Sequence, residues 1–140
     1  MKLYLMTVIL AGVLIAGVAA TYFFIQTFLV ADIYEIKMDV KVIDENRVGV
    51  TVDTDALHFG KVPREGAGMR NITLDNNDAR PHLVKMKAFG NISQFIYVSE
   101  NDFVMEPKES RNVTVTANPS SDVQTGYYEG TLQIIFMNMW

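Results

Sequence analysis

The chain divides into two parts by its pattern of hydrophobic and polar residues. From Leu3 to Ala31, 29 consecutive residues carry no charged side chain, and only three threonines and one glutamine interrupt the run. A helix needs ~20 apolar residues to cross the hydrocarbon core of a bilayer, and 29 helical residues extend about 43 Å. We therefore expect residues 1–31 to form one long N-terminal transmembrane helix.

A cleaved signal peptide is the main alternative for this segment. Val18, Ala19 and Ala20 provide small residues of the kind found at cleavage sites. The apolar run continues for eleven residues beyond them, whereas the apolar region of a signal peptide spans about 7–15 residues. This favours an uncleaved anchor, and a processed, pilin-like helix is a further alternative.

Residues 32–140 alternate between apolar and polar positions with a period of two, which indicates strands with one buried face. The alternation is strict from Tyr34 to Val42, and a turn at Asp44–Asn46 would join this strand in a hairpin to Val48–Val52. Further strands are expected around Leu57–Phe59, Ile72–Leu74, Val84–Ala88, Ile96–Val98, Phe103–Met105, Val113–Ala117 and Tyr128–Phe136. About eight short strands predict an all-β, antiparallel sandwich of immunoglobulin (Ig) type.

Composition narrows the functions open to residues 32–140. They contain all 16 acidic residues and 11 of the 12 basic ones, so their net charge is −5. An acidic domain is unsuited to nucleic acid, which calls for a basic surface. The chain has no cysteine, which excludes disulfides, thiolate zinc sites and thiol catalysis.

The glycine-containing stretch "HFGKVPREGAGMRNIT" (residues 58–73) could suggest a phosphate-binding loop. A Walker loop, however, requires a lysine and a serine or threonine after its last glycine, and a following helix. Here Val62 follows Lys61, and a strand pattern comes next. We interpret Gly60 as a bend between strands, and Gly66 and Gly68 as parts of a turn.

Three N-x-[ST] sequons begin at Asn71, Asn91 and Asn112. Asn71 and Asn112 fall on the polar phase of their predicted strands, and Asn91 falls in a predicted loop. All three could carry N-linked glycans without entering the core, which would place the domain outside the cell. The alternative is that these are ordinary polar residues on exposed strand faces.

Within the apolar helix, Gly12, Ala16 and Ala20 recur at four-residue spacing. A stripe of small residues permits close contact between helices in lipid. We expect this stripe to pack against another helix, and one candidate partner is a second copy of the chain.

Candidate catalytic and metal-binding residues are few. His58 and His82 have no neighbouring serine in a recognisable triad pattern, and we expect both to be solvated strand residues. Asp53–Asp55 and Asp75–Asp78 group oxygen ligands in turns, but neither matches a calcium loop. We therefore predict no enzyme activity, no metal and no cofactor.

Beyond the alternation, the stretch from Leu57 to Asn76 resembles the Ig-like domains of the major-sperm-protein and ASH type, which also occur in archaeal and bacterial surface proteins. Those domains commonly contain L-x-F-G-x-V-x-x-G, a strand, and N-x-x-x-x-P, matched here by Leu57, Phe59, Gly60, Val62, Gly66, Ile72, Leu74, Asn76 and Pro81. A second segment matches their later strands through Phe103, Met105, Pro107, Glu109, Ser110, Val113, Val115, Pro119, Gly126, Tyr128, Gly130, Leu132 and Ile134. Lys108 departs from the glycine usual in that family.

These features together predict a single-pass protein of the cell membrane. Lys2 precedes the helix, and Asp32 and Glu35 follow it, so the positive-inside rule places the N-terminus in the cytoplasm and residues 32–140 outside. We expect it to be a structural or accessory subunit of a cell-envelope assembly. The absence of cysteine, the sequons and the resemblance together favour an archaeal surface. The protein would bind other membrane or envelope proteins.

A pilin-like or archaellin-like filament subunit, with the helix in the filament core, is the alternative function. Precursors of that kind carry a basic leader before the apolar run, whereas Met1 and Lys2 alone precede it here. The expected partners in both cases are the bilayer, neighbouring proteins and N-linked glycans.

Overall fold

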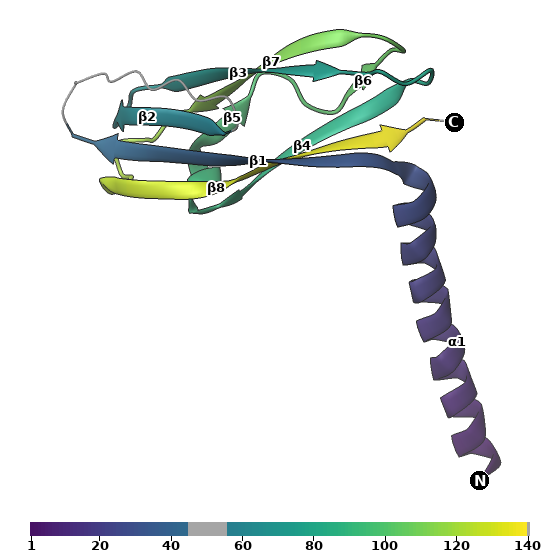
Figure 1. The fold of residues 1–140 in the computed structure, drawn as a ribbon. Coiled ribbons are helices and arrows are strands. Elements are labelled where there is room, and N and C mark those ends of the chain that lie inside the picture. The colour runs from purple at the N-terminus through teal and green to yellow at the C-terminus, as the bar shows by residue number, and fades with distance from the viewer. Residues whose placement is uncertain (45–55, 140) are drawn as a thin grey trace.

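The structure is a computed structural model that describes residues 1–44 and 56–139. It has two parts, an N-terminal apolar helix and a mostly β domain (Figure 1). The β domain contains two sheets in a sandwich-like arrangement, which confirms the predicted all-β architecture at that level.

The helix α1 spans Lys2–Phe24 and continues as a π-helical turn, η1, over Ile25–Leu29. Its two threonine hydroxyls, at Thr7 and Thr21, donate to the backbone carbonyls of Tyr4 and Gly17, at 2.8 and 2.9 Å. Such internal bonds remove the cost of placing a hydroxyl in an apolar solvent. The helix is long and apolar enough to cross a membrane, and none of its side chains is buried.

The two sheets differ in size. The larger has the order β2-β1-β8-β4-β6, formed by Leu57–Pro63, Val30–Ile43, Gly126–Asn138, His82–Gly90 and Phe103–Met105. The smaller has the order β3-β7-β5, formed by Gly68–Asp75, Ser110–Ala117 and Ile96–Val98. A short 3-10 helix, η2 (Asn91–Phe95), joins β4 to β5 and was missed because five residues give no helical period.

The core lies between the sheets and agrees with the predicted alternation. Met38, Val40 and Val42 on β1 are buried, whereas the residues between them are more exposed. The same holds for the predicted inward positions of the other strands, which supply Val84, Met86, Val113, Val115, Ala117, Leu132, Ile134 and Phe136 to one hydrophobic cluster. Burial of apolar surface is the main stabilising term for such a domain, since it has no disulfide.

The pairing of β1 differs from the expectation of a purely antiparallel sandwich. β1 pairs antiparallel with β8 on one side but parallel with β2 on the other. The predicted partner strand, Val48–Val52, lies outside the described residues. Alternation reports which face of a strand is buried and carries no information about its neighbour, so sequence reasoning could not find this parallel pair.

Gly60 also has a different role from the predicted bend between strands. It lies inside β2 with φ +72°, where two residues of β2, Phe59 and Gly60, oppose the single residue Val40 of β1. This is a β-bulge, which glycine permits because it lacks Cβ. The turn after β2 takes its positive φ (60°) at Glu65 and is closed by the Gly66 N–H, which donates to the Pro63 carbonyl at 3.0 Å. Gly66 is therefore part of a turn, as predicted, whereas Gly68 is the first residue of β3.

The helix joins the sandwich without a linker. η1 ends at Leu29 and β1 begins at Val30, which is already in register with Met137 of β8. Asn138 closes the junction, since its Nδ2 donates to the carbonyl of Phe28 at 3.1 Å. The sandwich consequently lies across the helix axis rather than extending it (Figure 1).

Two glycines let β4 and β8 approach closely. Gly90 and Gly130 are directly paired, and a Cβ at Gly130 would lie 2.0 Å from the carbonyl oxygen of Phe89. A Cβ on Gly90 would lie 2.6 Å from the Gly130 Cα, and Gly90 has φ +92°. A side chain at either position would push apart two strands of the larger sheet.

We therefore predict that Gly130→Ala lowers the free energy of unfolding by about 3 kcal/mol, because the backbone of β4 must move to admit the methyl group. Thermal unfolding of the full chain in detergent, followed by circular dichroism, measures the effect. Thr131→Ala is the matched control, since Thr131 points out of the sheet. Equal melting temperatures for the two variants would contradict the close approach.

Candidate functional site

A pocket of about 260 Å³ lies where the helix enters the sandwich. Its lining comes from the start of β1, the β3–β4 loop, and the facing ends of β4 and β8: Ala31, Asp32, Tyr34, Asp75, Asn76, Asn77, Asp78, His82 and Phe136. Three carboxylates make this end of the domain acidic. By contrast, the pockets along the helix are lined almost entirely by apolar side chains.

His82 is the buried titratable residue of the pocket. Its side chain is only 5% exposed, so the prediction that it is solvated is wrong. Its Nε2 lies 3.2 Å from Asp78 Oδ2, and its ring packs edge-on against Phe136. The alternation puts His82 on the same face as the buried Val84, and the error lies in expecting a histidine to avoid that face. The carboxylate of Asp78 provides a partner for Nε2, whereas Nδ1 is buried with no hydrogen-bond partner among the described residues.

Asp78 is held as an anion by its neighbours. The Ala79 backbone N–H, which donates to Asp78 Oδ1 at 2.6 Å, is the main cause that lowers the pKa of this carboxyl below its ordinary value of 3.8. His82 lowers the pKa further. Because the folded pKa is depressed, ionised Asp78 stabilises the loop at neutral pH, and this contribution is lost as the pH falls through that lowered pKa.

Asn76 organises the loop and is 3% exposed. Its Nδ2 donates to the carbonyls of Arg80, Met105 and Glu106 at 2.9, 3.2 and 3.0 Å. Its Oδ1 accepts from the Asp78 N–H at 3.1 Å. These bonds tie the β3–β4 loop to the β6–β7 turn. Sequence reasoning noted Asn76 as a position of the resemblance and as part of the polar turn Asp75–Asp78, and its burial was not foreseen.

Asn101 is a second residue whose role was missed. Its Oδ1 accepts from the Met86 N–H at 2.7 Å, and its Nδ2 donates to the Met86 carbonyl at 2.9 Å. The amide side chain thus pairs with β4 as a neighbouring strand would. It lies in the predicted turn Ser99–Asp102, where asparagine is too common to signal such a bond.

The pocket lining offers carboxylate, amide and imidazole groups beside two aromatic rings. None of its lining residues is a serine, threonine or cysteine that could act as a nucleophile beside His82. The described residues contain no group of three His, Asp or Glu side chains placed to hold a metal ion. The second predicted oxygen cluster, Asp53–Asp55, lies outside the described residues. His58 lies on β2, which neighbours β1, and is half-buried. Its Nδ1 pairs with the carboxylate of Asp39 on β1.

Two of the predicted glycosylation sequons lie side by side on the smaller sheet. Asn71 pairs with Thr114, and Thr73 pairs with Asn112, across β3 and β7. Thr114 Oγ1 donates to Asn71 Oδ1 at 2.9 Å, and Thr73 Oγ1 donates to Asn112 Oδ1 at 2.7 Å. Both asparagines are exposed, and an N-glycan attaches to Nδ2 rather than to Oδ1. Their occupancy stays a prediction.

The third sequon begins at Asn91, the first residue of η2, which is exposed. Its Oδ1 accepts from the Glu129 N–H at 2.7 Å. Asn91 lies beside β4 and β8 of the larger sheet, whereas Asn71 and Asn112 lie on β3 and β7 of the smaller sheet. The three asparagines therefore do not form one site.

The small-residue stripe of the helix, Gly12, Ala16 and Ala20, is fully open to its surroundings. A Cβ added to Gly12 would meet no atom within 4 Å, and the same is true of Gly17. The stripe has the geometry for helix contact, and its use stays a prediction.

Comparisons with known proteins return no family model, no curated protein and no solved structure that matches this chain. Any function therefore has to be inferred from the chain's own residues and their geometry.

We predict that Asn76→Ala lowers the free energy of unfolding by about 2–3 kcal/mol, because the carbonyls of Arg80, Met105 and Glu106 lose their shared amide donor. Denaturant unfolding of the full chain in detergent would measure this. Asn77→Ala is the matched control, since the neighbouring side chain is exposed. If both variants unfold at the same denaturant concentration, the network around Asn76 does not hold the loop.

Proposed function

We propose that the protein is a membrane-anchored structural or accessory subunit of a cell-envelope assembly. Its helix spans the cell membrane once, with the N-terminus in the cytoplasm and an Ig-like, major-sperm-protein or ASH-type domain outside. The observation that carries this proposal is the apolar segment Lys2–Leu29, none of whose side chains is buried by the domain. Each exposed leucine, isoleucine or phenylalanine side chain costs about 1.5–3 kcal/mol in water, so this helix requires lipid or other helices around it.

The orientation is supported by charge and by the sequons. Lys2 lies at one end of the helix, and Asp32 and Glu35 lie at the other, as the positive-inside rule requires for an outer domain. Asn71 and Asn112 are exposed on the smaller sheet, on strand faces that a glycan can reach.

A role in binding is supported by what the domain offers. The lining of the acidic pocket at the helix junction contains no serine, threonine or cysteine, and the helix presents an open stripe of small residues. Both the pocket and the stripe are suited to contact with another molecule, and neither suggests a catalysed reaction. Lateral contacts through the stripe would bring the domains of neighbouring subunits together just outside the membrane.

The mass of the native assembly tests this function. The protein is extracted from its own membranes in mild detergent, and the complex is weighed and its subunits are identified by mass spectrometry. We expect a defined complex, either with other envelope proteins or with a small number of copies of this chain. A long homopolymer would show that the helix forms a filament core and would overturn the accessory role.

We predict that Gly12→Leu weakens that assembly about tenfold, because a large side chain separates helices that touch through small residues. Gly17→Leu is the matched control, because Gly17 is equally open but lies outside the stripe. Analytical ultracentrifugation in detergent measures both. Equal effects of the two substitutions would exclude the stripe as the contact.

We further predict that Asn71→Gln removes one glycan when the protein is made in its own host. The loss would appear as one mobility step on a gel and one missing glycopeptide. Asn118→Gln is the control, because proline follows Asn118 and blocks modification. Thr73→Ser should retain the glycan on Asn71, whereas Thr73→Ala should lose it. Unmodified Asn71, Asn91 and Asn112 would contradict this part of the proposal.

A further inference from the structure

The outer face of the larger sheet carries an unusual share of the basic residues. Strand register places Lys37 and Lys41 of β1 on this face, with Lys61 of β2 beside Lys41, and Lys85 and Lys87 on β4. The chain has six lysines outside the helix, and these are five of them. We call this surface the lysine face.

The lysine face differs in charge from the rest of the domain. Three carboxylates share it, those of Glu35, Asp39 and Glu129, so its balance is positive. The other described residues after the helix include ten acidic and five basic side chains. Asp102, from the loop before β6, pairs with Lys85 at the edge of the face, at 3.5 Å. A domain that is acidic as a whole therefore has one basic side.

Apolar side chains on the same face lie nearest to the helix. Ile33 of β1 pairs with Ile135 of β8, and Met137 pairs with Leu83 of β4, all pointing away from the core. Farther along, Lys87 lies over the Phe89 ring at 5.1 Å, and Lys41 lies over the Tyr127 ring at 5.0 Å. An apolar edge followed by lysines and aromatic rings is the pattern of surfaces that lie at a lipid interface.

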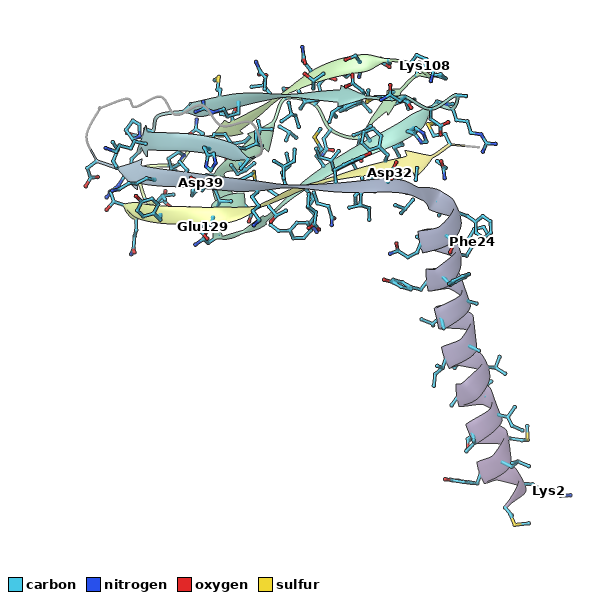
Figure 2. All side chains as sticks on the ribbon, viewed as in Figure 1. Lys2, Phe24, Asp32, Asp39, Lys108 and Glu129 are labelled. Carbon is cyan, nitrogen blue, oxygen red and sulfur yellow. The ribbon has the colours of Figure 1, made fainter. Side chains whose placement is uncertain are left out.

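The direction of the helix decides what this face meets. Figure 1 shows α1 leaving the right-hand end of the sandwich and running downward, toward the side on which β1 and β8 lie and away from β3 and β7. Figure 2 shows Glu129 on that same side and Lys108, the remaining lysine, on the opposite layer. Direct entry into β1 and the bond from Asn138 to the Phe28 carbonyl hold this arrangement.

From this geometry we propose that the lysine face is a membrane-docking surface for anionic lipid headgroups of the bilayer that α1 crosses. The domain lies flat on the membrane, with the apolar edge at Ile33 and Met137 seated in the headgroup layer. Each lysine near an anionic surface strengthens such docking about fivefold. The smaller sheet, with Asn71 and Asn112, then faces away from the membrane. This inference rests on the proposed transmembrane anchoring.

The chain suits a test by site-directed spin labelling, because it has no cysteine. Thr131→Cys places a label on the lysine face, and Thr116→Cys places a matched label on the outer face of the smaller sheet. The full chain is reconstituted in phosphatidylcholine vesicles with about 30% phosphatidylglycerol, and in phosphatidylcholine alone. Collision of each label with a nickel-chelating lipid headgroup reports its distance from the membrane surface.

We expect collisions at position 131 to exceed those at position 116 at least about threefold in the anionic vesicles, and to decrease in phosphatidylcholine alone. Adding Lys37→Glu and Lys87→Glu to the 131-labelled chain should abolish the excess, whereas Lys108→Glu should leave it unchanged. Equal collision rates at the two positions would overturn the proposal. The proposal would also be overturned if the label at position 131 collided with neither the nickel-chelating lipid nor a water-soluble nickel chelate. A second protein would then cover the lysine face.

Resistance to alkaline carbonate separates the two proposals. If the chain stays in the vesicles after carbonate but the label at position 131 shows no headgroup contact, the transmembrane anchor is supported and the docking surface is wrong. A chain that carbonate removes has no transmembrane anchor, and both proposals are then wrong.

Discussion

The structure depends on one solvent constraint. An apolar segment of 28 residues, Lys2–Leu29, forms a helix that the rest of the described chain does not cover. Its backbone groups form hydrogen bonds within the helix, and the hydroxyls of Thr7 and Thr21 donate to helix carbonyls. Such a helix is stable in lipid and unfavourable in water. Because β1 begins directly after it at Val30, whatever solvent surrounds the helix also decides where the sandwich lies.

The strands of the sandwich and their buried faces could be predicted from the sequence, because apolar and polar residues alternate along each strand. The alternation from Tyr34 to Val42 identified Met38, Val40 and Val42 as core residues, and the structure confirms it. Strand neighbours were not predictable, because the parallel pairing of β1 with β2 depends on contacts between distant segments. The bulge at Gly60 likewise arises from the register of two strands, and sequence reasoning saw only an interruption there.

The candidate site was harder to predict than the fold, for a physical reason. Asp78 gives the buried His82 a partner at Nε2, and burial of Asn76 is tolerable because its amide donates to the carbonyls of three other residues. These partners come together only when the β3–β4 loop meets the β6–β7 turn. The local sequence correctly predicted that both segments are polar turns. It could not predict the hydrogen bonds between them.

The two outer surfaces of the sandwich have different chemistry. The smaller sheet presents uncharged threonines and asparagines, joined across β3 and β7 through Thr73 and Asn112. The larger sheet presents lysines, aromatic rings and an apolar edge. An anchored domain has one side toward the membrane and one side away from it, and this difference in chemistry matches that division.

The location of the domain relative to the membrane is the central claim, and protease protection tests it most directly. Protease is added to intact cells and, separately, to opened cells, and the membranes are then washed with alkaline carbonate. The account predicts digestion of the domain in intact cells, with a fragment that contains α1 retained in the carbonate-washed membrane. A domain digested only after the cells are opened, or a chain released by carbonate, would contradict it.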